Sequence, residues 1–235
     1  ILRNIGNEQK RLPRTLIFTK VLVVPQWEEE FYKFSKLTKA QLTLLQGSQA
    51  DRCEDFRAKA LLPGETSSPQ TASHVFVTNT EALIMKDLVA LFHTWRPEVV
   101  IFDECHDLKS HEAQRSKVAY ELANPYDKKQ KLWAPKPKTY LLSGSPVLQG
   151  PLDLFQQVKI MLGGWPTRKY FECGDRRELI TNYFIFRGTY FRDKNASFAG
   201  SADYWPDWRP MTKEKDGFDS IGEIGWILEQ ISVYA

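Results

Sequence analysis

The sequence predicts an α/β fold in which helices cover both faces of a mostly parallel β-sheet. Short apolar runs alternate with longer stretches of helical periodicity, as in "RTLIFT" (14–19) and "QWEEEFYKFSKL" (26–37). Strands that are apolar throughout are typical of parallel sheets buried on both faces. Polar residues gather where several of these runs end, which is the edge at which such sheets bind ligands.

The strands and helices follow one another in order up to residue 163. The expected strands occupy residues 14–19, 41–47, 74–79, 98–103 and 138–145, and the expected helices occupy 26–37, 51–62, 80–95, 111–123 and 151–162. In the first helix, Trp27, Phe31 and Phe34 lie on one face, so we expect them in the core. Pro151 opens the last helix, and turn-forming residues predict a loop at 63–73.

The composition and the pattern of the sequence change after residue 163. Residues 164–235 are aromatic, basic and irregular, apart from an amphipathic stretch at 220–235 that predicts a final helix. We therefore expect a main domain at 1–163 and a satellite segment at 164–235 that packs on it and leads onward to a further domain.

Composition excludes several classes of protein. The chain of 235 residues is 42% hydrophobic and 26% charged, with a net charge of +3, which is ordinary for a globular protein. Three widely spaced cysteines argue against a disulfide framework or a zinc ribbon. No run is apolar over the length needed to span a bilayer, and the start has no signal-peptide core. Because the chain does not begin with Met, we interpret it as a fragment or a processed piece.

One stretch carries candidate chemistry at a strand end. "VVIFDECHDLKS" (99–110) runs from an apolar strand into Asp103, Glu104 and His106. An acidic pair at a strand end is often only a helix cap or a solvated turn. It also suits a nucleotide–magnesium site, in which the first carboxylate holds Mg²⁺ through water and the second orients and deprotonates the attacking water.

Four segments, in order, resemble motifs of one family. Residues 99–106 resemble the Walker B motif of superfamily-two helicases in its DEAH/DECH form, and "LLSGSPVLQGPLDLFQQVKIM" (141–161) resembles the motif III region of the Swi/Snf-type branch. "PQWEEEFYKF" (25–34) is similar to motif Ia, and "VFVTNTEAL" (75–83) to motif Ib. The segment at 182–198 resembles phage-type members.

The resemblance implies a RecA-like P-loop NTPase lobe that uses ATP and Mg²⁺ to move along double-stranded DNA. By position, Asp103 would hold Mg²⁺ through water, Glu104 would be the catalytic base, and His106 would couple hydrolysis to motif III. The motif III residues would be Ser143, Gly144 and Ser145, and the residues near the DNA backbone would be Thr19, Lys20, Gln26, Thr78 and Asn79.

The sequence departs from the family pattern in two ways. It contains no G-x-x-x-x-G-K-[ST] phosphate loop and no second lobe. We therefore expect an incomplete lobe, inactive alone, whose partners are duplex DNA and the rest of its parent chain. We expect no membrane association and a cytoplasmic location, in the host cell if the gene is from a phage, or a nuclear one in a eukaryote.

Two other functions stay open from the residues alone. A lobe that has lost its ATP chemistry would be a non-catalytic DNA-binding or docking module. An unrelated magnesium-dependent hydrolase would need more carboxylates at the same edge. Cys105 is interpreted as a buried spacer, and the spacing of His106 and His111 does not match a helical zinc motif.

A basic and aromatic cluster after residue 182 is a separate candidate surface. Arg187, Arg192 and Lys194 are interleaved with Tyr190 and Phe191. This pattern fits either contacts with phosphates and bases or a solvated basic edge.

Overall fold

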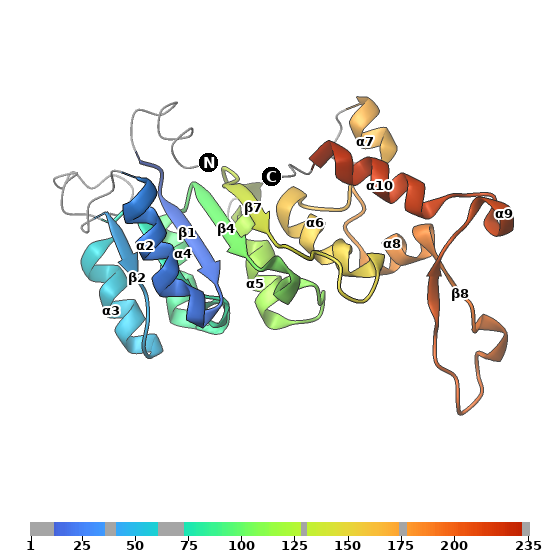
Figure 1. Cartoon of the computed structure of the whole chain (residues 1–235), viewed down its shortest axis with the longest axis horizontal. Coiled ribbons are helices and arrows are strands. Elements are labelled where there is room, and N and C mark those ends of the chain that lie inside the picture. The colour runs from blue at the N-terminus through green and yellow to red at the C-terminus, as the bar shows by residue number, and fades with distance from the viewer. Residues whose placement is uncertain (1–11, 36–40, 61–72, 128–130, 174–177, 232–235) are drawn as a thin grey trace. The chain divides into compact units, whose positions relative to one another are not determined.

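The computed structural model describes residues 12–35, 41–60, 73–127, 131–173 and 178–231 (Figure 1). It forms two compact units, residues 1–148 and 149–235. The helix after Pro151 belongs to the second unit, because Leu154 and Phe155 lie in the core of that unit. The structural units thus divide earlier than residue 163, and the domain limits expected from the sequence stay a prediction.

A five-stranded sheet forms the centre of the first unit. Its strands are β1 (Thr15–Thr19), β2 (Leu42–Leu44), β3 (Val75–Asn79), β4 (Val99–Asp103) and β7 (Lys138–Leu142). Their order is β2-β3-β1-β4-β7, and every neighbouring pair is parallel. The predicted α/β class and parallel sheet are confirmed. The carboxyl ends of all five strands therefore lie at the same edge of the sheet (Figure 1).

Helices cover both faces of this sheet. They are α2 (Val24–Phe34), α3 (Gln49–Lys59), α4 (Lys86–Trp95) and α5 (Gln114–Ala123), with short helices η1 (Val21–Val23), η2 (Thr80–Ile84) and η3 (Cys105–Leu108). A small antiparallel pair, β5 (Tyr126–Asp127) and β6 (Leu132–Trp133), lies between α5 and β7 in the chain.

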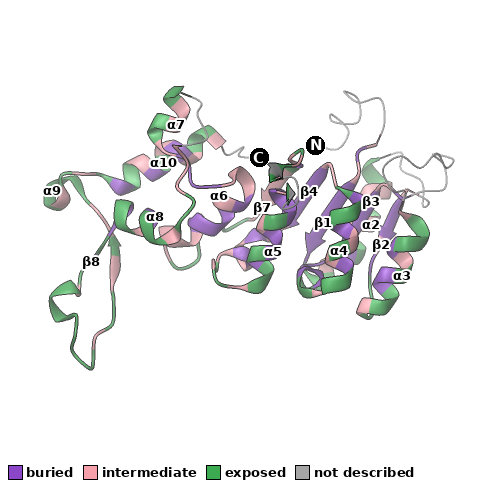
Figure 2. Ribbon diagram, turned by 180° about the vertical axis from the view of Figure 1, so that it is seen from behind, coloured by how far each residue is buried: buried purple, intermediate pink, exposed green. Residues whose placement is uncertain are grey.

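Alternating side chains of the strands form two separate packed layers. On one face, Val24, Trp27 and Phe31 of α2 pack with Ile17 and its neighbours. On the other face, aromatic rings from the sheet and from α3 and α4 contact one another, and these are Phe18, Phe56, Phe76, Phe92, Trp95 and Phe102. Figure 2 shows β1, β3 and β4 as mostly buried, which explains their apolar sequences.

Some details of the predicted helices need correction. Ser48 caps α3 by accepting a hydrogen bond from the Asp51 backbone, so the helix begins at Gln49 and not at residue 51. Phe34 is 74% exposed, so its expected place in the core was wrong, because it lies in the last turn of α2. Residues 61–72, which hold most of the predicted loop at 63–73, lie outside the described residues.

The second unit has its own aromatic core, which includes Phe155, Trp165, Phe186 and Ile227. It contains α6 (Leu154–Leu162), α7 (Arg168–Cys173), α8 (Tyr183–Tyr190), α9 (Lys213–Asp216) and α10 (Ser220–Ile231). The described part of this unit also contains the short helices η4 (Pro151–Asp153) and η6 (Ala196–Phe198) and the antiparallel pair β8 (Phe191–Asp193) and β9 (Trp208–Pro210). Within the described residues, no helix is long and apolar enough to cross a membrane.

Candidate functional site

The Asp103 carboxylate is fixed by three donors at the end of β4. Its Oδ2 atom accepts hydrogen bonds from Thr19 Oγ1 at 2.8 Å and from Trp27 Nε1 at 3.0 Å. Its Oδ1 atom accepts one from the backbone N–H of Glu104 at 3.1 Å. Because β1 and β4 are adjacent and parallel, the end of β1 delivers Thr19 directly to the carboxylate.

Glu104 follows with an unusual backbone conformation. Its φ and ψ are 55° and 50°, in the left-handed region, which costs a non-glycine residue on the order of 1–3 kcal/mol. The turn brings its Oε2 atom to 3.1 Å from His106 Nδ1, while the Glu104 side chain stays 37% exposed. Such strain is concentrated at functional sites, and here it leaves a carboxylate accessible beside Asp103.

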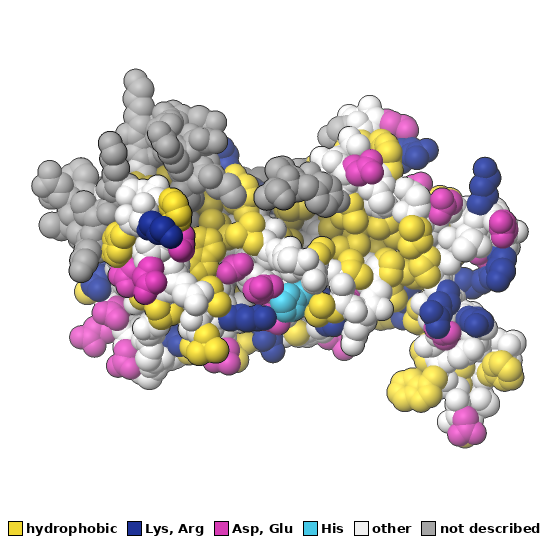
Figure 3. Space-filling view, viewed as in Figure 1, with side chains coloured by type: hydrophobic (Ala, Val, Ile, Leu, Met, Phe, Trp, Pro, Cys, Tyr) yellow, Lys and Arg dark blue, Asp and Glu magenta, His cyan; other side chains and the backbone are white. Residues whose placement is uncertain are grey.

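His106 connects the end of β4 with the end of β7. Its Nδ1 atom lies 3.4 Å from Ser143 Oγ, and its Nε2 atom lies 3.6 Å from Asp107 Oδ1. Ser143 Oγ also accepts a hydrogen bond from the backbone N–H of Ser145 at 3.1 Å. β4 pairs with β7 in parallel, and Asp103 is in register with Leu142, immediately before Ser143. Figure 3 shows acidic side chains beside a histidine on one face of the molecule.

Comparison with known proteins places the chain in a family. The model of the SNF2-related domain matches residues 1–173. The chain belongs to the SNF2-related domain family. The SWI2/SNF2 ATPase core of Sulfolobus solfataricus, solved in complex with double-stranded DNA, has a similar fold, with a TM-score of 0.51 and 15% sequence identity. That likeness covers 80% of this chain and 30% of the Sulfolobus chain. No curated protein matches.

The family assignment confirms the Swi/Snf-type resemblance and the RecA-like fold, and identifies a helicase-like ATPase family. Members of such a family use Mg²⁺ with ATP. In the described residues, no group of three acidic, histidine or cysteine side chains could hold a metal by itself. A single carboxylate is compatible with Mg²⁺, which typically keeps several waters and takes its other ligands from substrate phosphates. The Asp103 carboxylate therefore fits a site for Mg²⁺ that is bound together with a nucleotide.

The five side chains expected near DNA fall into two groups. Lys20 and Gln26 are exposed. Thr19, Thr78 and Asn79 are buried and make internal hydrogen bonds. These internal hydrogen bonds explain why polar residues can stand at the buried ends of apolar strands. Direct contact of a side chain with DNA stays a prediction for Lys20 and Gln26.

Arg52 is a residue that the sequence pattern did not reveal. Its side chain is buried, and burial lowers the pKa of its guanidinium. It donates hydrogen bonds to Thr78 Oγ1 at 3.0 Å, to Asn79 Oδ1 at 2.7 Å and to the Gly47 carbonyl at 3.0 Å. Arg52 thus holds the end of β3 in place, and only its position on the apolar face of a helix could have indicated this role.

The remaining candidates are mostly structural. Cys105 is 3% exposed, and burial raises the pKa of its thiol to about 12, so it is not a nucleophile near neutral pH. In the second unit, Tyr190 and Phe191 are buried and therefore cannot stack on bases. Arg192 pairs with Asp216 at 2.5 Å, and the Arg187 guanidinium lies 3.9 Å from the centre of the Trp208 ring.

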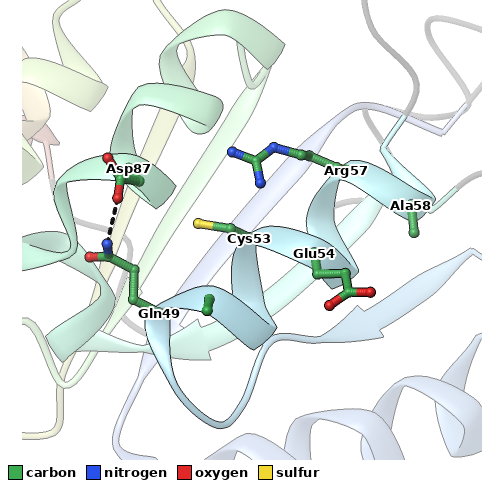
Figure 4. A pocket seen from close by; sticks show the side chains of 7 residues that line it. Gln49, Cys53, Glu54, Arg57, Ala58 and Asp87 are labelled. Carbon is green, nitrogen blue, oxygen red and sulfur yellow. Dashed lines mark hydrogen bonds between the residues drawn. The ribbon is translucent and has the colours of Figure 1, made fainter.

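An open groove lies between α3 and α4. Gln49, Cys53, Glu54, Arg57 and Asp87 line it together with Ala50 and Ala58 (Figure 4). Gln49 Nε2 donates to Asp87 Oδ2 at 2.7 Å, which ties the two helices together across the groove. The lining carries both signs of charge and an inert buried thiol, so it indicates no particular ligand.

Proposed function

We propose that this chain is part of the first lobe of a motor that hydrolyses ATP and moves along duplex DNA. The observation that carries the proposal is the position of His106, whose Nδ1 atom is within reach of both Glu104 and Ser143. A single imidazole nitrogen has one proton or one lone pair, so it bonds well with only one of these partners at a time. Because only one partner can be bonded at a time, a change at Glu104 can change the bond to Ser143. This behaviour suits a residue that couples hydrolysis to motif III.

The two carboxylates at the end of β4 have separate tasks. Bound Mg²⁺ would neutralise charge on the phosphates and orient them. Asp103 would hold a metal-bound water through Oδ1, because Oδ2 is already occupied by two donors. Glu104 would orient the attacking water and accept its proton at the exposed carboxylate.

Contact with duplex DNA is proposed for the same edge of the sheet. The Sulfolobus ATPase core of similar fold was solved with double-stranded DNA. Lys20 and Gln26 are exposed after β1 and at the start of α2. A motor must tolerate any sequence, so these residues are expected to contact phosphates and not bases.

A non-catalytic DNA-binding or docking module is the second candidate. The observation in its favour is that these 235 residues contain no G-x-x-x-x-G-K-[ST] loop, which supplies the backbone cradle and lysine for the phosphates. For the same reason, we expect the 235-residue chain by itself to bind ATP weakly and to hydrolyse it negligibly.

Hydrolysis of ATP by the full-length protein, with and without duplex DNA, separates the two functions. We expect magnesium-dependent hydrolysis that rises on addition of DNA. Absence of hydrolysis at every DNA concentration, with DNA binding retained, would favour the non-catalytic module. Strong hydrolysis by the 235-residue chain alone, lost in Glu104→Gln, would refute the proposal that it contains only part of the site.

A further inference from the structure

The hydrogen bonds around Asp103 are unequally divided between its two oxygen atoms. A carboxylate offers about four lone-pair sites, two on each oxygen. Thr19 and Trp27 fill both sites on Oδ2, whereas Oδ1 accepts only the backbone N–H of Glu104 among the described residues. The site that is left on Oδ1 is therefore the one that can accept a hydrogen bond from a metal-bound water.

Trp27 is well anchored for holding a carboxylate. Its ring packs against the core layer formed by β1, β3 and β4, and its centre lies 5.7 Å from that of Phe31 on the next turn of α2. The apolar part of the ring thus fixes the helix on the sheet, and the indole N–H at its edge reaches the end of β4. Buried indoles commonly combine packing with one directed hydrogen bond in this way.

We propose that Trp27 is a positioning residue for Mg²⁺ and ATP, acting through Asp103. Its indole N–H holds Oδ2 and so keeps Oδ1 turned toward the metal-bound water, and Thr19 supports the same orientation from β1. The inference rests on the proposed function, in which Asp103 is the magnesium carboxylate. Partners that orient a metal-binding group commonly change metal affinity or activity by about 10–100-fold when they are removed.

Two substitutions remove these donors while keeping part of each side chain in place. Trp27→Phe keeps an aromatic ring against Phe31 and deletes the indole N–H. Thr19→Val is isosteric and deletes only the hydroxyl. Each variant removes one of the two hydrogen bonds to Oδ2, so both should change the same property in the same direction.

The chain offers a matched control for each variant. Thr15 lies at the other end of β1, is fully buried, and donates its hydroxyl to the Pro13 carbonyl at 2.9 Å. Trp95 is fully buried in α4, and its Nε1 atom has no hydrogen-bond partner within the described residues. Thr15→Val therefore removes a buried hydrogen bond and Trp95→Phe disturbs packing, and neither substitution touches Asp103.

The test is the Mg²⁺ dependence of ATP binding at equilibrium, measured by calorimetry on the full-length protein. For Trp27→Phe and Thr19→Val, we expect tight ATP binding to require about tenfold more Mg²⁺, with ATP binding in the absence of metal unchanged. Thr15→Val and Trp95→Phe should lower the unfolding temperature and leave the Mg²⁺ dependence as in the wild type. An unchanged Mg²⁺ dependence in both Trp27→Phe and Thr19→Val would overturn the inference.

Asp103→Asn distinguishes failure of the inference from failure of the proposed function. If Asp103→Asn shifts the Mg²⁺ dependence and Trp27→Phe does not, Asp103 is the magnesium carboxylate and Trp27 does not position it. If Asp103→Asn leaves the Mg²⁺ dependence unchanged, the assignment of Asp103 itself is wrong.

Discussion

His106 Nδ1 lies 3.4 Å from Ser143 Oγ, across the adjoining ends of β4 and β7. The two residues are far apart in the sequence, and only the parallel pairing of their strands brings them together. The same nitrogen is 3.1 Å from Glu104 Oε2. A change at the Glu104 carboxylate, which we propose as the base, can therefore alter the bond between His106 and Ser143.

His106→Ala and Ser143→Ala should have non-additive effects on the DNA-stimulated ATPase of the full-length protein. A direct hydrogen bond contributes about 0.5–1.5 kcal/mol, so the double-mutant cycle should give a coupling energy of that size. His111→Ala, a histidine outside this contact, is the matched control and should combine additively with Ser143→Ala. Additive effects of His106→Ala and Ser143→Ala would remove the proposed link.

Lys20→Ala should weaken binding of the full-length protein to duplex DNA about equally on unrelated sequences. Because one phosphate contact is lost, the slope of log affinity against log salt should fall by about one. Titration of two labelled duplexes at several salt concentrations measures both effects. Lys59→Ala, at the far end of α3, should change neither. An unchanged slope in Lys20→Ala would remove this lysine from the DNA path, and a sequence-selective loss would contradict a motor.

Arg52→Met should destabilise the 235-residue chain by about 2–3 kcal/mol, because three acceptors at the ends of β2 and β3 lose a charged donor. Urea denaturation followed by circular dichroism measures the loss. Arg57→Met, in the same helix and exposed, should change the free energy of unfolding by less than about 0.5 kcal/mol. Equal effects of the two substitutions would show that the Arg52 hydrogen bonds are not important for stability.

Thiol labelling should distinguish the three cysteines of the folded chain. Cys173 is exposed and should react with a disulfide reagent at pH 8. Cys53 and Cys105 are buried, and burial raises the pKa of both thiols, that of Cys105 to about 12. Since the thiolate is the reactive form, both should stay unlabelled until urea is added. Rapid labelling of Cys105 in the native chain would contradict its role as a buried spacer.

The sheet could be predicted because its physical requirements are visible locally. A strand buried on both faces needs an uninterrupted apolar run, and β1, β3 and β4 have one each. Parallel pairing then brings the strand ends to one edge, so the proximity of Asp103 to the start of motif III also followed. The second unit could not be predicted in detail, because α8 carries apolar residues on both its buried and its exposed side. Phe186 and Tyr190 are buried, whereas Phe184 and Ile185 are exposed.

Several side chains in the site have roles that a pattern cannot reveal. Trp27 matched a core position by its spacing, and its ring does pack in the core, but its indole N–H extends to Asp103. Thr19 and Thr78 resembled surface polar residues at strand ends, whereas their hydroxyls satisfy partners inside the fold. Periodicity records which face a residue occupies, and not where the polar end of its side chain reaches.

The most direct measurement is ATP turnover by the full-length protein carrying Glu104→Gln, with ATP binding measured on the same sample. The substitution preserves the size of the side chain and removes the base, so we expect turnover to fall by about 10²–10⁴-fold while ATP affinity stays within a few-fold of the wild type. Glu112→Gln, whose side chain is 81% exposed, should retain normal turnover. Near-normal turnover by Glu104→Gln would show that the attacking water is activated elsewhere and would contradict the proposed hydrolytic site.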